Sequence, residues 1–73
     1  MVTVKVCYAS DGKPVKSKGV TLDFGLMRGM SGPEYTKSSG EAHFDADPGS
    51  GKVYVGGESV YEGRLAGRVV VYI

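Results

Sequence analysis

Tryptophan, asparagine and glutamine are absent from this chain, and cysteine and histidine occur once each, as Cys7 and His43. A lone cysteine excludes an intrachain disulfide, and one cysteine with one histidine is too small a set for a structural zinc site. No apolar run is long enough to span a membrane. A chain of 73 residues buries only about 60% of its unfolded surface. We therefore expect strand pairing, tight turns or self-association to help stabilise it.

The chain also lacks a strong charge of either sign. Nine basic and eight acidic residues leave a formal net charge of +1, too little to draw in nucleic acid or an anionic membrane. Residues 1–5 alternate like a strand and do not have the basic start and unbroken apolar stretch of a signal peptide. We expect a cytoplasmic protein if the chain is complete, and an extracellular one if it is part of a larger protein.

What the chain does contain is a pattern typical of short strands. Twelve residues are glycine and five are tyrosine, and apolar residues alternate with polar ones in several segments. Glycine or proline interrupts nearly every stretch long enough for a helix. We predict one all-β domain over residues 1–73, a small sandwich of about seven short, mostly antiparallel strands.

Alternation also predicts which side chains face the core of this sandwich. They are Val2, Val4, Val6, Tyr8, Val20, Leu22, Phe24, Ala42, Phe44, Ala46, Val53, Val55, Val69, Val71 and Ile73. Cys7 is expected on the opposite face of the first strand, half exposed. Residues 25–33 break the alternation and are expected to be a loop or an irregular short strand. Residues 48–51 are expected to be a glycine-rich hairpin turn.

A series of turn and strand motifs follows one another along the chain: Asp11–Val15, Val20–Leu22, Thr36, Gly40, Ala42–Phe44, Pro48–Gly49 and Val53–Val55. These motifs resemble those of the carboxypeptidase regulatory-like domains, a family with an Ig-like/prealbumin-like (transthyretin-like) sandwich. The resemblance implies an accessory or binding module, often one part of a larger secreted or cell-surface protein. The single histidine and the Val71-Tyr-Ile73 ending differ from the histidines and the Tyr-Arg-Gly-Ser signature of transthyretin-related hydrolases. The resemblance therefore implies no hydrolase activity.

Glu41, His43 and Asp45 project from one face of a predicted strand and carry groups that bind divalent metals. Same-face side chains on a strand lie about 7 Å apart, so the three would need a ligand from a neighbouring strand to converge. We interpret them as a solvated face and only a weak metal candidate. Nothing in the spacing brings Cys7 to His43 as a nucleophile and base. We predict no enzyme activity and no cofactor.

Two apolar features favour contact with another protein. The loop Leu26–Met30 carries Met27 and Met30, which make adaptable binding surface if exposed, whereas Leu26 and Met30 would cap the core if buried. In the last strand, Arg68–Ile73, residues Val70 and Tyr72 face away from the core, so the strand is apolar on both faces. It is then either central to a sheet or, at an edge, open to strand addition by a second copy.

We therefore predict a non-catalytic binding or structural module that self-associates through an edge strand or binds another protein. The alternative is a small β-barrel of OB or SH3 type that binds nucleic acid or another anionic ligand. Its basic side chains would be Lys13, Lys16, Lys18, Arg64 and Arg68.

Overall fold

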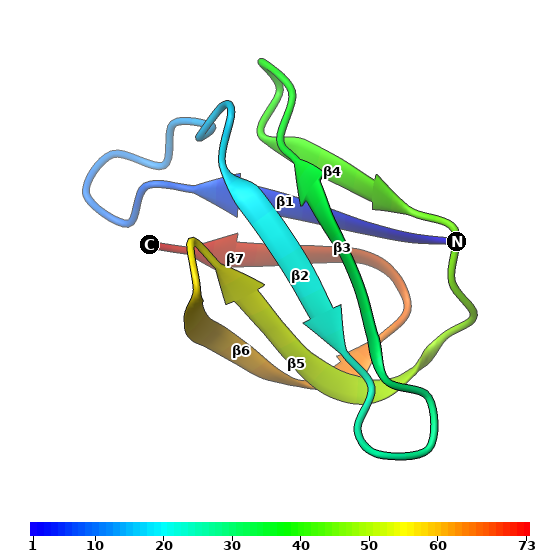
Figure 1. The fold of residues 1–73 in the computed structure, drawn as a ribbon. Coiled ribbons are helices and arrows are strands. Elements are labelled where there is room, and N and C mark those ends of the chain that lie inside the picture. Colours follow the sequence, from blue (N-terminus) through cyan, green and yellow to red (C-terminus); the bar gives the residue numbers. More distant parts are fainter.

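Seven strands and no helix make up the computed structural model, which describes residues 1–73 (Figure 1). The strands are β1 (Val2–Cys7), β2 (Gly19–Asp23), β3 (Met30–Tyr35), β4 (Glu41–Phe44), β5 (Gly49–Val55), β6 (Glu58–Leu65) and β7 (Gly67–Tyr72). No helix has the length and hydropathy needed to cross a membrane. The all-β fold that alternation predicted is confirmed.

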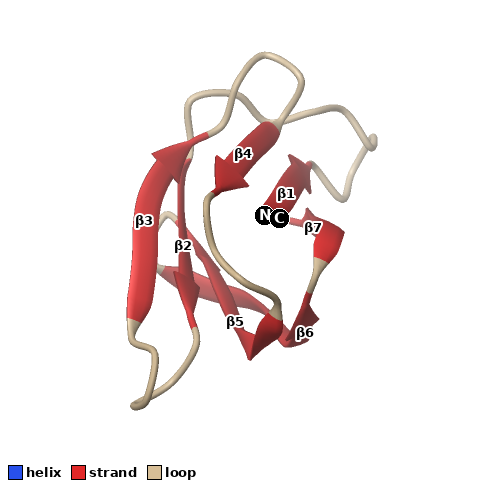
Figure 2. Cartoon of the chain, turned by 90° about the vertical axis from the view of Figure 1, so that its right-hand side faces the viewer, coloured by secondary structure: helices blue, strands red, loops and turns tan.

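The strands form two sheets that lie face to face as a small sandwich (Figure 1, Figure 2). One sheet has the order β4-β1-β7 and the other the order β3-β2-β5-β6. Neighbouring strands are antiparallel except β1 and β7, which are parallel, with Val2 opposite Gly67 and Cys7 opposite Tyr72. The first and last strands of the chain therefore lie side by side.

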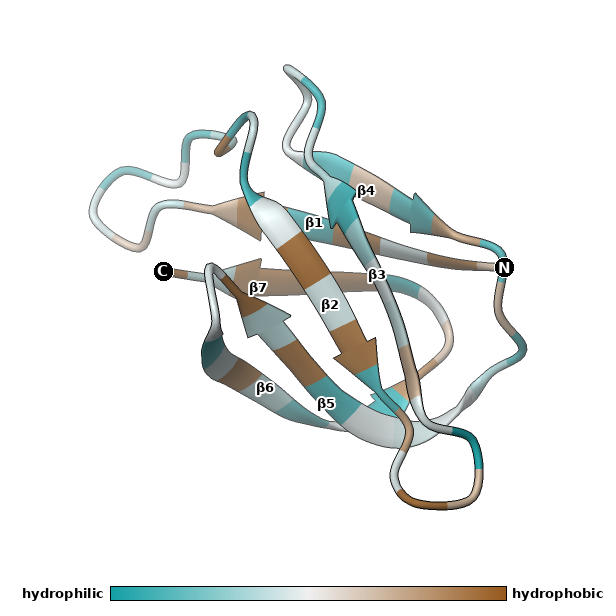
Figure 3. Ribbon diagram, in the orientation of Figure 1, coloured by the Kyte–Doolittle hydropathy of each residue, from teal (hydrophilic) through white to brown (hydrophobic).

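An apolar core fills the space between the sheets. Apolar and polar bands alternate along β2 and β5 (Figure 3), as expected for strands with one face against the core. The buried cluster consists of Val2, Val4, Val6, Val15, Val20, Leu22, Ala42, Phe44, Val53, Val55, Leu65, Val69 and Val71. Phe24 and Ala46 are partly buried against it. Most of the predicted core is confirmed, whereas Val15 and Leu65 were not predicted.

The predicted exposures at the ends of β1 and β7 are wrong. Tyr8 is 44% exposed and Ile73 is 38% exposed, whereas Cys7 is buried. Strand β1 ends at Cys7, and Tyr8 enters a tight turn in which its carbonyl accepts from Gly12 N–H at 2.7 Å. Alternation therefore stops before Tyr8. The returning chain pairs with Cys7 through Pro14, and this bridge lies beside the buried thiol.

Residues 48–51 do not form the predicted hairpin turn. Strands β4 and β5 belong to different sheets, and Gly49 already lies in β5, opposite Leu65 of β6. A Cβ atom at Gly51 would collide with the backbone carbonyl of Asp23. Glycine is needed here because two backbones approach closely, and not because the chain reverses.

Residues 25–33 contain both of the structures that the sequence left open. A loop, residues 24–29, is followed by strand β3, which begins at Met30. The pairing of β2 with β3 shifts register between Val20 and Leu22, so one extra residue bulges from β3. Strand β3 is therefore irregular, as the broken alternation indicated.

A buried threonine fixes the long connection between β1 and β2 to the end of β3. The Thr36 hydroxyl accepts from Lys18 N–H at 3.0 Å, and the Thr36 backbone N–H donates to the Lys18 carbonyl at 2.9 Å. The Thr36 carbonyl accepts from Ser17 N–H at 2.8 Å. All three polar groups of Thr36 are thus satisfied, as buried polar groups must be. The connection that carries the lysines is held in place by these bonds.

Two leucines that undergo the same substitution test this description of the core. Leu22 is fully buried and Leu26 is fully exposed. Leu22→Ala should lower the free energy of unfolding by about 2–5 kcal/mol because it leaves a cavity. Leu26→Ala should change it by less than about 0.5 kcal/mol. Urea unfolding followed by circular dichroism measures both values, and similar effects at the two positions would contradict this core.

Candidate functional site

Each sheet ends in two edge strands, each of which has a hydrogen-bonded neighbouring strand on one side only. The edge strands are β4 and β7 in one sheet and β3 and β6 in the other. Open edges can pair with other chains, so soluble proteins usually protect them with charge, proline, bulges or short length. The four edges of this domain can be compared for such protection.

Three of the four edges are protected. Strand β3 contains Pro33, which has no N–H to donate, and the extra residue described above. Strand β6 carries Glu58, Glu62 and Arg64 and has its own register shift opposite Val53 and Tyr54. Strand β4 is only four residues long. Each of these edges is a poor template for another strand.

Strand β7 has the least of this protection. It is six residues long, contains no proline, and pairs with β1 without a register shift. Its only charge is Arg68, near its beginning. Val69 and Val71 are buried, whereas Val70 is 42% exposed and Tyr72 is 58% exposed. The strand is therefore apolar on both faces. It lies at an edge, so the alternative that it is central to its sheet is wrong.

Hydrogen bonds of Ile73 define which backbone groups of β7 face the open edge. Ile73 N–H donates to the Cys7 carbonyl at 2.9 Å, and the Ile73 carbonyl accepts from Ala9 N–H at 2.9 Å. Both groups of Ile73 thus point toward β1. Because successive residues of a strand present these groups to opposite edges, those of Val70 and Tyr72 point outward. The β7 edge is defined here as Arg68, Val70 and Tyr72, whose backbone groups face outward.

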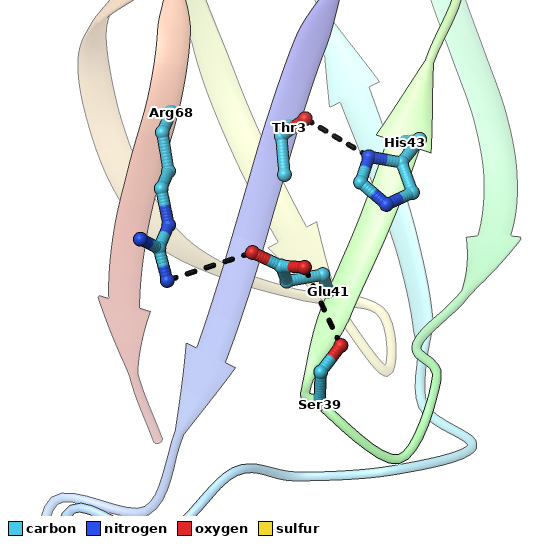
Figure 4. Close-up of polar contacts among 5 residues, drawn as sticks. All are labelled: Thr3, Ser39, Glu41, His43 and Arg68. Carbon is cyan, nitrogen blue, oxygen red and sulfur yellow. Dashed lines mark hydrogen bonds and ion pairs between the residues drawn. The ribbon is translucent and has the colours of Figure 1, made fainter.

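The outer face of this sheet is polar beside the β7 edge (Figure 4). Arg68 reaches across β1 and pairs with Glu41, at 3.5 Å between Nη2 and Oε2. The Thr3 hydroxyl and His43 Nδ1 share a hydrogen bond of 2.9 Å. Ser39 also donates to Glu41, at 3.4 Å. These contacts involve β4, β1 and the start of β7, and leave Val70 and Tyr72 as the apolar part of the face.

The weak metal candidate does not form a ligand cluster. Glu41 is half-buried and faces Arg68, His43 contacts Thr3, and Asp45 lies beyond the end of β4. No group of three or more His, Cys, Asp or Glu side chains is arranged to hold a metal ion. The prediction that these residues point outward from the core is confirmed for His43 and Asp45, which are exposed.

Cys7 and His43 lie at different positions along β1. His43 is opposite Thr3, whereas Cys7 is four residues further along the same strand, opposite Tyr72. That spacing corresponds to about 13 Å along the strand. The structure thus does not bring the thiol to the imidazole.

The loop of residues 24–29, called the β2–β3 loop, is exposed. Leu26 and Met27 are almost completely accessible, and Met30 at its end is also exposed. The alternative that Leu26 and Met30 cap the core is therefore wrong. Hydrogen bonds brace the loop internally, from Phe24 N–H to the Gly29 carbonyl at 2.9 Å and from Gly29 N–H to the Gly25 carbonyl at 2.7 Å.

Arg28 anchors the β2–β3 loop to the connection between β4 and β5. Its guanidinium donates to the carbonyls of Asp47, at 2.6 Å, and Pro48, at 3.1 Å. It also lies over the Phe24 ring, 3.9 Å from the ring centre, as a cation–π pair. Sequence reasoning missed this role, because the acceptors are backbone groups about twenty residues away.

The five basic residues of the alternative function do not form one patch. Lys13, Lys16 and Lys18 lie in the connection that follows the end of β1. Arg64 and Arg68 flank the start of β7, which pairs with the beginning of β1. The length of β1, about 17 Å, thus separates the two groups. Arg68 is in addition paired with Glu41.

An open hollow of about 440 Å³ lies over β2, β5 and β6, beside the β2–β3 loop. Its lining residues are Asp23, Phe24, Gly25, Ser50, Gly51, Lys52, Glu62 and Gly63. In the strand register Lys52 lies opposite both Asp23 and Glu62, so the charges of this row alternate. Sequence reasoning did not predict the hollow, because it assigned residues 48–51 to a turn.

Two surfaces thus carry much of the exposed apolar area. One is the β7 edge with Val70 and Tyr72, and the other is the β2–β3 loop with Leu26 and Met27. The chain matches no protein-family profile, no curated protein and no solved structure.

Removing the anchor should loosen the β2–β3 loop without unfolding the domain. Arg28→Gln loses the cation–π pair and most of the bonding to Asp47 and Pro48. The amides of Gly25 and Gly29 should then exchange about three- to tenfold faster, while the free energy of unfolding changes by less than about 1 kcal/mol. Amide hydrogen exchange measures the effect. Arg64→Gln, at an arginine with no such contacts, is the control and should leave these amides unchanged.

The buried position of Cys7 predicts slow reaction with thiol reagents. The side chain is 5% exposed, so a reagent such as an aromatic disulfide can reach it only when the end of β1 opens. The native thiol should react at least about a hundredfold more slowly than in urea. The absorbance of the released thiolate product gives the rate of the reaction. Equal rates in the native and unfolded states would contradict the burial of Cys7.

Proposed function

We propose that this domain is a non-catalytic binding or structural module that associates with a second copy of itself through the β7 edge. One observation carries the proposal: β7 is the only edge strand that has no proline, no bulge and more than four residues, and its single charge, Arg68, lies near its beginning. Strand addition at such an edge pairs its outward backbone groups and covers its apolar side chains.

The free energy of this association would come from both the new backbone hydrogen bonds and the covered side chains. Backbone groups at the open edge already bond to water, so each new hydrogen bond contributes only about 0.5–1.5 kcal/mol. Covering Val70 and Tyr72 removes apolar area from water in addition. An interface built on one strand is small, so we expect an association that responds to dilution.

Association would also stabilise the fold. A domain of 73 residues buries a small share of its surface, and it has neither a disulfide nor a metal cluster. A partner that binds only the folded state raises the free energy of unfolding by mass action. Association through the β7 edge would therefore also stabilise this small domain against unfolding.

The resemblance to carboxypeptidase regulatory-like domains supports an accessory role, and we propose membership of that group. The segment Asp11–Val15 lies in the connection from β1 to β2, and Pro48–Gly49 lies at the start of β5. The fold is a seven-stranded sandwich, as that resemblance implies. On this proposal the chain serves as a module that positions or joins other parts of a protein assembly.

A second surface for a different protein is the β2–β3 loop. Leu26 and Met27 stand fully exposed on a loop that Arg28 anchors to the connection before β5. Flexible methionine side chains on a fixed loop adapt to apolar pockets.

Less supports the alternative of a small β-barrel that binds an anionic ligand. The two sheets share no hydrogen-bonded strands, and the basic residues lie in two separate groups.

Light scattering across a dilution series tests the proposed function. The wild-type chain should have a solution mass above that of the 7.7 kDa monomer at high concentration, and the mass should fall on dilution. Tyr72→Lys should leave a monomer at all concentrations, because it places a charge on the β7 edge. Met27→Lys, at an equally accessible residue on the β2–β3 loop, should associate like the wild type.

A monomer at every concentration would overturn self-association. Loss of association in Met27→Lys but not in Tyr72→Lys would instead move the interface to the β2–β3 loop. Circular dichroism of each variant would show whether it remains folded.

A further inference from the structure

We infer that the second copy pairs with β7 in antiparallel orientation, with Val70 directly opposite the partner's Val70. The two β4-β1-β7 sheets would then join into one continuous sheet across a two-fold axis. This inference rests on the proposed function and adds the orientation, the register and the residues that meet.

The β7 edge is accessible to such a partner. The nearest strand of the other sheet, β6, forms no hydrogen-bonded pair with β7. A hollow of about 310 Å³ lies between Ile73, just after the end of β7, and Val60 and Glu58 of β6. Val70 is 42% exposed and Tyr72 is 58% exposed, so their outward backbone groups are open to an added strand.

Symmetry decides the orientation. Two copies that use the same edge are related by a two-fold axis, the commonest closed arrangement. In a parallel pair, a residue whose groups face the partner lies opposite one whose groups face away. A two-fold axis along the strands would place Val70 opposite the partner's Val70 and break that rule. In an antiparallel pair, two residues whose groups both face the partner lie directly opposite each other and exchange both of their hydrogen bonds. The two-fold pair is therefore antiparallel.

The pattern of outward groups decides the register. With the axis at Val70, Val70 meets its own copy, and Arg68 meets the partner's Tyr72 on each side. Three pairs of residues then exchange two bonds each, about six in all. With the axis at Val71, Val70 of each copy lies opposite Tyr72 of the other copy. These two pairs exchange two bonds each, about four in all. The Val70 register is thus the one that leaves no outward group of Arg68, Val70 or Tyr72 unpaired.

The side chains fit this register. Val70 packs against the partner's Val70 at the axis, and Tyr72 covers the aliphatic stem of the partner's Arg68. The guanidinium of Arg68 extends toward Glu41 of its own copy, so no like charges lie directly opposite. At each end Gly67 lies opposite the partner's Ile73, and open space around the Gly67 Cα leaves room for that side chain.

Cysteine cross-linking under mild oxidation shows which residues of the two copies lie opposite each other, and so tests the register. Directly opposite residues in a hydrogen-bonded antiparallel pair have Cα atoms about 5.5 Å apart, within the range of a disulfide. Val70→Cys alone should therefore give a symmetric disulfide dimer. The cysteine variants also carry Cys7→Ala, because Cys7 lies opposite Tyr72 in the pairing of β1 with β7 and could pair with a cysteine at that position. A mixture of Arg68→Cys with isotope-labelled Tyr72→Cys should then give the mixed disulfide at least about tenfold more than either symmetric one. Mass spectrometry separates the products, and the wild type, whose Cys7 is buried, is the control.

The outcomes separate the register from the proposed function. If Val70→Cys with labelled Tyr72→Cys gives the preferred mixed disulfide, the axis lies at Val71 and the inferred register is wrong, while association through the β7 edge stands. If the wild type is a monomer throughout the dilution series, the proposed function fails and the register fails with it.

Discussion

The parallel pairing of β1 with β7 is the constraint on which the rest of the structure depends. It joins the two ends of the chain over the whole length of β1 and brings Ile73 into hydrogen bonds with Cys7 and Ala9. It also places β1 in the middle of its sheet, between β4 and β7. β1 occupies one side of β7, and none of the other six strands pairs with its other side, which is therefore open.

The same alternation that builds the core at β7 also defines its exposed edge. Val69 and Val71 point into the sandwich and their backbone groups face β1, while Val70 and Tyr72 point outward and their backbone groups face water. An apolar outer face and an unpaired edge therefore coincide on the same two residues. This coincidence, and not a pocket or a cluster of reactive groups, is the reason for proposing a module that associates.

Local pattern predicted much of this fold, and long-range contacts account for what it missed. Alternation within single segments was enough to place Leu22 in the core. Leu65 was missed because it belongs to β6 only through its pairing with Gly49 of β5. The same long-range pairing explains why Gly49 lies in a strand and not in the predicted turn. The burial of Cys7 depends on the end of β1 and the bridge to Pro14. Periodicity showed that β7 is apolar on both faces, but its place at an edge required the complete strand order.

Hydrogen exchange of single amides in β7, followed by NMR at high and low protein concentration, tests the central claim most directly. The amides of Val69 and Val71 face β1 and should exchange slowly at both concentrations. Those of Val70 and Tyr72 face the open edge, so they should be protected at high concentration and exchange at least about tenfold faster after dilution. Exchange of Val70 and Tyr72 that is equally fast at both concentrations would contradict pairing at this edge.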